Sequence, residues 1–194
     1  MPVNAETCFE AIAGFKLIIL KNLEAMKFLL IAFMLCAISI SYSQTYYVVR
    51  HAEKKSPQAT EKMMSNNPPL SEAGKQRAEA LMELLKTEEI GYVFSTNTVR
   101  TLSTAEPVKN YFKLETEIYE AVPGESFISR LLSLDKNCLI VGHSNTVDDI
   151  VNKMCGSVKV PGDLADTAYD NVFVITKKGN TLNFENRKFG KASP

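Results

Sequence analysis

The sequence predicts an α/β fold in which a largely parallel sheet carries helices on both faces. Three observations support this fold class. Short apolar runs alternate with amphipathic stretches from Thr45 onward. Two of the runs, 46–49 and 138–141, are almost wholly apolar, which is typical of strands buried on both faces. The length of 194 residues favours one domain with a sizeable core.

Each expected element is short and is followed by turn-forming residues. Ser71 is placed to cap the first helix, and Pro107 is expected to bend or restart the second helix. The expected elements are, in chain order, strand 46–49, a polar loop over 56–69, helix 71–87, strand 91–94, helix 98–112, a weak strand 117–119, helix 126–134, strand 138–141, helix 145–155 and a hairpin of strands 171–176 and 181–186.

The first 43 residues are expected to be an N-terminal targeting segment, and residues 44–194 the folded domain. The apolar run 28–40 is too short for a spanning helix but suits the core of a signal peptide over about 26–43. Residues 1–25 fit no signal-peptide pattern, which is consistent with a start-site artefact upstream of Met26. An exported, periplasmic or secreted protein is therefore expected. A membrane anchor left uncleaved and a buried N-terminal helix are the alternatives.

Composition limits the partners. Lys plus Arg and Asp plus Glu both number 22, so the formal net charge is zero. The protein therefore has no overall positive charge that would attract nucleic acid or an anionic membrane. After signal cleavage no stable membrane partner is expected, and the oligomeric state is open. Export leaves Cys138 and Cys155, which could pair in an oxidising compartment but are better explained as two buried apolar residues.

Charged and polar residues follow three of the expected strands. Arg50 and His51 come after the first strand, Arg100 comes soon after the second, and His143 follows the fourth. Ligands of open α/β sheets bind beyond the carboxyl ends of the strands. The only two histidines of the chain are therefore expected to meet two arginines at one edge of the sheet.

These residue types suit phosphoryl transfer. The planar guanidinium groups of Arg50 and Arg100 match phosphate oxygens and stay charged. A neutral imidazole at His51 is a competent nucleophile, and nearby guanidinium charges disfavour its protonation. His143 is placed to stabilise charge on the transferred group.

Four segments resemble the signature motifs of the histidine phosphatase superfamily, the phosphoglycerate mutase-like proteins. They occur in that family's order and span nearly the whole of 44–194: YVVRHAEK (47–54), LSEAGKQRA (70–78), STNTVRTLSTA (95–105) and GHSNT (142–146). The resemblance implies a three-layer α/β/α sandwich, no metal and no other cofactor. It also implies that His51 is phosphorylated, with Arg50, Arg100 and His143 forming the phosphate pocket.

The general acid is less clear from the sequence. Glu120, just past the third strand, is the candidate for a catalytic role, and a solvated loop carboxylate is the alternative interpretation. Glu53 is expected to orient Arg50 or its loop instead. Without an acid, the protein would favour good leaving groups such as phosphohistidine or aryl phosphates.

The function predicted from these residues is a metal-independent phosphatase that hydrolyses phosphomonoesters through a phosphohistidine at His51. Its substrate would be a small phosphorylated molecule or a phosphoprotein. Among the small members of the family, the compact chain most resembles the phosphohistidine phosphatases. A phosphohistidine-protein phosphatase, a phosphoglycerate-type mutase and a non-catalytic phospholigand-binding protein are the alternatives. Export argues against the mutase, because glycolytic intermediates are cytosolic.

Overall fold

A computed structural model describes residues 16, 20–24, 26–28, 43–55 and 67–193. The chain divides into two units, 1–41 and 42–194. In the first unit the described residues are helical. Most of the predicted signal peptide lies outside the described residues, so that prediction stays open. No helix in the described ranges is long and apolar enough to cross a membrane.

The second unit is built on one six-stranded sheet with the strand order β3-β2-β4-β1-β5-β6. The first four strands in this order run parallel to one another. The strand β5 runs antiparallel to β1, and β6 runs antiparallel to β5. Their bounds are β1 Ser43–Arg50, β2 Ile90–Ser95, β3 Thr116–Ile118, β4 Asn137–Gly142, β5 Asn171–Lys178 and β6 Thr181–Lys188. The largely parallel sheet of the sequence prediction is confirmed.

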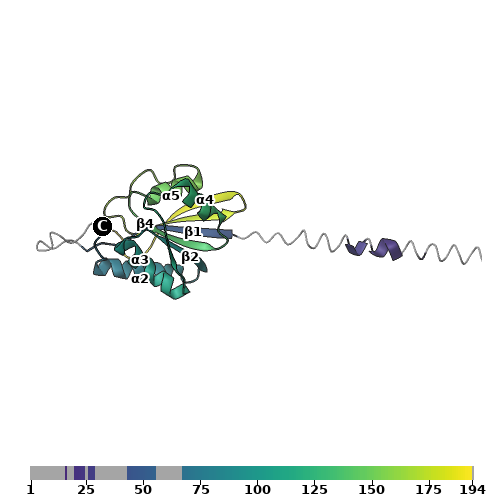
Figure 1. Ribbon diagram of the computed structural model, residues 1–194, viewed down its shortest axis with the longest axis horizontal. Coiled ribbons are helices and arrows are strands. Elements are labelled where there is room, and N and C mark those ends of the chain that lie inside the picture. The colour runs from purple at the N-terminus through teal and green to yellow at the C-terminus, as the bar shows by residue number, and fades with distance from the viewer. Residues whose placement is uncertain (1–15, 17–19, 25, 29–42, 56–66, 194) are drawn as a thin grey trace, which may run out of the picture. The chain divides into compact units, whose positions relative to one another are not determined.

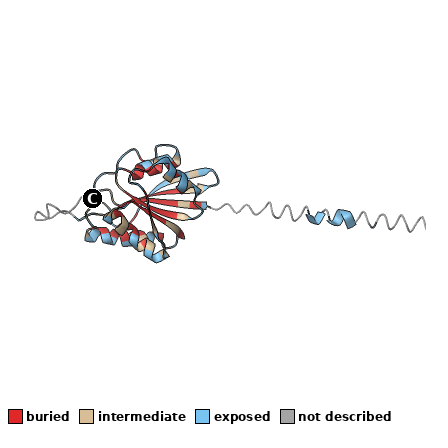
Figure 2. Ribbon diagram, viewed as in Figure 1, coloured by how far each residue is buried: buried red, intermediate tan, exposed pale blue. Residues whose placement is uncertain are grey.

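Helices cover both faces of the sheet, as Figure 1 shows. The helices α2 Glu72–Leu85 and α3 Val99–Phe112 lie on one face, and α4 Glu125–Ser133 and α5 Val147–Cys155 lie on the other. Successive residues of a strand point to opposite faces. In β1, Tyr46 and Val48 pack with α4 and α5, whereas Tyr47 and Val49 pack with α2 and α3. Both faces are therefore buried (Figure 2), and the predicted three-layer α/β/α sandwich is confirmed.

The predicted helix starts depend on side-chain caps. Ser71 Oγ accepts a hydrogen bond from Gly74 N at 3.1 Å at the start of α2, as the sequence predicted. Thr98 Oγ1 caps α3 in the same way through Thr101 N. Of the two alternatives predicted at Pro107, the restart is wrong, because α3 continues as one helix through this proline. On either side of this proline, Ala105 and Val108 pack α3 against the sheet.

Close packing ties α2 to the loop that follows β1. A Cβ added to Gly74 would lie 2.2 Å from the carbonyl oxygen of Glu53, so only glycine fits there. The backbone N of Ser71 also donates to that same carbonyl at 2.8 Å. The start of α2 therefore fixes the chain two residues after His51. Cys138 is a buried free thiol, as the preferred interpretation of the sequence predicted, whereas the free thiol of Cys155 is only partly buried.

Candidate active site

His51 lies directly after β1 at the carboxyl edge of the parallel strands. Its backbone N donates to Gly142 O at 2.9 Å, and only 5% of the residue is exposed. The ring nitrogen Nδ1 lies 2.8 Å from Ala52 O. Because a carbonyl oxygen only accepts, Nδ1 carries the hydrogen and Nε2 keeps its lone pair. His51 is thus held in the tautomer that a nucleophilic Nε2 requires.

His143 follows β4 and faces His51 with the two ring centroids 5.5 Å apart. Arg100 Nη2 lies 3.3 Å from Nδ1 of His143, and Thr96 Oγ1 lies 2.9 Å from its Nε2. A guanidinium only donates, so Nδ1 holds a lone pair and Nε2 donates to Thr96. The structure therefore brings together the two histidines and one predicted arginine from three strand ends.

A relay of threonine hydroxyl groups sets this arrangement. Thr96 Oγ1 donates to Thr101 Oγ1 at 3.0 Å, and Thr101 Oγ1 donates in turn to the carbonyl of Thr96 at 2.8 Å. On the next turn of α3, Thr104 Oγ1 donates to Arg100 O and accepts from Ala52 N at 2.9 Å. These threonines were not predicted from the sequence to have a role. The four-residue spacing from Arg100 to Thr104 was the available signal, because it places both on one helix face.

Arg50 completes the group and is almost wholly buried, with 4% of the residue exposed. Its Nη1 donates to the carbonyl oxygens of Ala165 at 2.8 Å and Asp166 at 3.1 Å. Its Nε is buried and has no partner among the described residues. An unpaired buried donor destabilises a fold by about 1–3 kcal/mol. An oxyanion ligand that accepts a hydrogen bond from Arg50 Nε would therefore recover this free energy.

The electrostatics keep both imidazoles neutral. The pKa of His51 is lowered to about 3, and burial is the largest cause. The charges of Arg100 and Arg50 and the His143 ring lower this pKa further, whereas the hydrogen bond to the Ala52 carbonyl raises it. Burial followed by the two arginines lowers the pKa of His143 to about 4. The direction agrees with the expectation from sequence, which named the guanidinium charges. Burial contributes more than they do.

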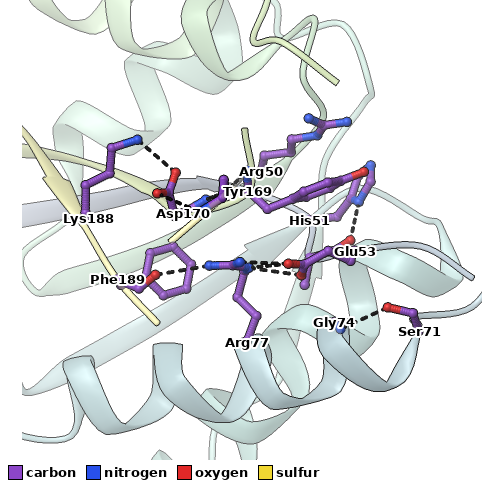
Figure 3. Close-up of polar contacts among 12 residues, drawn as sticks. Arg50, His51, Glu53, Ser71, Gly74, Arg77, Tyr169, Asp170, Lys188 and Phe189 are labelled. Carbon is purple, nitrogen blue, oxygen red and sulfur yellow. Dashed lines mark hydrogen bonds and ion pairs between the residues drawn. The ribbon is translucent and has the colours of Figure 1, made fainter. Parts of the chain in front are cut away.

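Glu53 does not face the histidines but pairs with Arg77 of α2, as Figure 3 shows. Both carboxylate oxygens accept from Arg77, at 2.7 Å for the shortest contact, and Arg77 Nη1 also donates to Phe189 O at 3.1 Å. Arg77 is buried and the Glu53 side chain is 23% exposed, so this is a partly buried bidentate pair. Glu53 therefore holds the loop after His51, which is one of the two roles expected for it.

Glu120 is exposed, two residues beyond β3 at the sheet's edge. Within the described part of the chain it makes no hydrogen bond or ion pair. Strand spacing of about 4.8 Å puts β3 roughly 14 Å from β1, so Glu120 would have to reach across two strands. Its catalytic role stays a prediction. Nor do three or more His, Cys, Asp or Glu side chains gather as a metal site in the described ranges.

Comparisons with known proteins agree with this geometry. The family model for the histidine phosphatase superfamily (branch 1) matches residues 46–122. Of the solved structures, the protein histidine phosphatase SixA complexed with tungstate is 18% identical, with a TM-score of 0.58 over 74% of this chain and 96% of that one. YhfR of Bacillus stearothermophilus is 19% identical, with a TM-score of 0.53 over 72% and 94%.

A phosphoglycerate mutase from Bacillus anthracis is 17% identical, with a TM-score of 0.54 over 76% of this chain and 93% of that one. At these identities the structures show a common fold. No curated protein sequence matches the chain. The matched segment contains three of the four motifs quoted from the sequence, and the fold places the fourth, at His143, beside them. The chain therefore resembles the histidine phosphatase superfamily in sequence over residues 46–122, and its fold is that of the solved structures named above.

Proposed function

We propose that this protein is a phosphatase that hydrolyses phosphomonoesters through a phosphohistidine at His51, without a metal ion. The observation that carries the proposal is the tautomer of His51. Its Nδ1–H is held by the Ala52 carbonyl, so Nε2 presents a lone pair among cationic groups. A buried neutral imidazole beside guanidinium groups is both nucleophilic and next to a site for the phosphate oxygens.

The reaction would run in two steps. In the first, Nε2 of His51 attacks phosphorus, the P–O bond to the leaving group breaks, and the leaving oxygen takes up a proton. In the second, water attacks the phosphohistidine, the P–N bond breaks, and phosphate leaves as the water loses a proton. Arg50 and Arg100 would bind the phosphate oxygens throughout, and His143 would join them by turning its Nε2–H from Thr96 to a phosphate oxygen, which stabilises charge in both transition states.

A phosphohistidine-protein phosphatase is the second candidate, and the exposure of Glu120 favours it. A leaving imidazole or phenol needs less help from an acid than a leaving alkoxide does. A structure with the same fold is that of a protein histidine phosphatase. We further propose that the protein is exported and that cleavage of the signal peptide leaves Gln44 as the first residue, which N-terminal sequencing of the secreted protein would test.

The proposed function is tested with the full-length protein and para-nitrophenyl phosphate. Wild-type protein is expected to hydrolyse this substrate equally with and without a chelator, and His51→Ala is expected to be inactive. A phosphorylated His51 peptide in the quenched wild-type reaction, found by mass spectrometry, would identify the intermediate. Activity that persists in His51→Ala would exclude His51 as the nucleophile. Phosphate binding without turnover would instead support a non-catalytic binding protein.

A matched pair of arginine variants separates pocket effects from general charge effects. Arg100→Ala removes a guanidinium group that contacts His143. Arg130→Ala removes an exposed arginine on α4 that pairs with Glu117 on β3. The first is expected to lower kcat/KM by roughly a hundredfold and the second to leave it unchanged.

A further inference from the structure

Tyr169 is a further aromatic residue at the same edge of the sheet. It directly precedes Asp170 and β5, and β5 runs antiparallel to β1. The chain therefore enters β5 at the edge where β1 ends, next to His51. The Tyr169 and His51 ring centroids are 6.2 Å apart, and Arg50 Cζ lies 4.2 Å from the Tyr169 ring centroid. Figure 3 shows the Tyr169 side chain extending alongside His51.

The backbone that carries Tyr169 is held from the C-terminal end of the chain. Ser193 Oγ accepts from Tyr169 N at 3.0 Å and from Asp170 N at 3.1 Å. The Asp170 carboxylate in turn pairs with Lys188 Nζ at 2.8 Å and accepts from Ser193 N at 3.2 Å. A side chain on a backbone fixed in this way is placed for a role that needs defined geometry.

The Tyr169 hydroxyl interacts with both arginines of the site. Burial lowers the pKa of Arg50 and of Arg100, and in each case the nearby Tyr169 oxygen opposes part of that lowering. The Tyr169 phenol therefore lies in a cationic environment, with the Arg50 guanidinium over the face of its ring.

The leaving oxygen needs a proton donor, and few described side chains near His51 are suited to supply one. Arg50 and Arg100 stay charged and hold their protons. The Asp166 carboxylate is fully exposed and lies 3.9 Å from Arg50 as the anionic partner of an ion pair. His143 already donates its one proton to Thr96. Tyr169 contributes a phenol O–H on a ring whose centroid lies 6.2 Å from that of His51, and tyrosine is a known general acid in enzymes.

We propose that Tyr169 is the general acid and base of the reaction, an inference that rests on the proposed function. As the P–O bond breaks, the phenol O–H gives its proton to the leaving oxygen, which departs as an alcohol. The tyrosinate, held by Arg50 and Arg100, then takes a proton from the water that attacks the phosphohistidine. The phenol is restored and phosphate leaves, so each cycle begins and ends with neutral tyrosine.

The test compares Tyr169→Phe with wild type on two substrates, para-nitrophenyl phosphate and glycerol phosphate. The value of kcat/KM reports the phosphorylation step, in which only the alkoxide leaving group needs a proton. Tyr169→Phe keeps the ring on Arg50 and removes only the hydroxyl. It is expected to lower kcat/KM on glycerol phosphate roughly a hundredfold and to change it only a few-fold on the aryl ester. Tyr111→Phe, an exposed tyrosine on α3, is the matched control and is expected to match wild type on both.

Two outcomes would overturn the inference. In the first, Tyr169→Phe changes kcat/KM equally on both substrates, or on neither. This outcome counts when the wild type hydrolyses the aryl ester and His51→Ala does not. The other is a loss confined to the alkyl ester in Glu120→Gln but absent in Tyr169→Phe, which would assign the acid to Glu120. An inactive wild type, or an active His51→Ala, would instead refute the proposed function itself.

Discussion

Acidification should destabilise this protein through its two histidines. Each has an ordinary pKa of 6.5 in the unfolded chain, and in the folded protein the values fall to about 3 for His51 and about 4 for His143. Between these values and 6.5 the unfolded state binds more protons than the folded state. Stability contributed by the two neutral imidazoles is therefore complete at pH 8 and is lost as the pH falls through 6.5 toward 4.

The expected loss at pH 5 follows from the unfolded value. The free energy of protonating an unfolded histidine at pH 5 is RT ln(1 + 10^1.5), or about 2 kcal/mol. At this pH the buried ring of His51 is still almost wholly neutral, so the folded state recovers little of that amount. The result changes little if its folded pKa moves by half a unit. His51 therefore accounts for about 2 kcal/mol of lost stability between pH 8 and pH 5, and the half-buried His143 adds a smaller amount because solvent screens it.

Chemical denaturation at pH 8 and pH 5 measures this loss. Carboxylates also titrate in this range, so the informative quantity is the difference between wild type and His51→Gln. Wild type is expected to lose about 2 kcal/mol more than His51→Gln, and His143→Gln should show a difference of the same sign but smaller size. With only two histidines in the chain, ¹⁵N-histidine NMR can follow each ring directly. Equal losses in wild type and His51→Gln, or a ring that becomes protonated near pH 6.5, would refute the reasoning.

Three further predictions concern the supports of the site. Gly74→Ala should destabilise the fold by about 1–3 kcal/mol or more in denaturant unfolding, because its Cβ would overlap the Glu53 carbonyl. Arg77→Met should be destabilising by about 3–5 kcal/mol since it leaves the Glu53 carboxylate unpaired, and the added Glu53→Gln should recover part of that loss in a double-mutant cycle. Arg100→Ala should weaken competitive inhibition by inorganic phosphate at least tenfold, and unchanged inhibition would remove it from the phosphate pocket.

The elements of the sandwich could be predicted because local signals and tertiary packing agree. The run Tyr46–Val49 is apolar on both faces, and both faces are buried by helices. Ser71 both begins and caps its helix as its sequence context indicates. The convergence of His51 and His143 followed from one topological rule, that ligands lie beyond the carboxyl ends of parallel strands.

The parts that sequence did not yield depend on register and on long-range contacts. Tyr169 reaches the site because β5 is antiparallel, so the start of that strand lies where β1 ends. The rule for parallel strands says nothing of such a residue. The partner of Glu53 was also open, since the bidentate pair with Arg77 depends on how α2 is seated against the loop after His51. Glu120 had a suitable position along the chain, but its strand lies at the edge of the sheet.

Geometry also distinguishes the nucleophile from its neighbour without reference to any relative. His143 has no lone pair to offer, because Arg100 donates to its Nδ1 and its Nε2 carries the hydrogen bound to Thr96. His51 uses its one N–H on a backbone carbonyl, which cannot rotate away or change its role as acceptor. The lone pair of His51 therefore stays on Nε2. The partners of His143 are side chains, which can turn toward a bound oxyanion. Of the two imidazoles, only His51 presents a fixed lone pair suited to the proposed attack on phosphorus, and His143 could turn its N–H toward the charge that would develop.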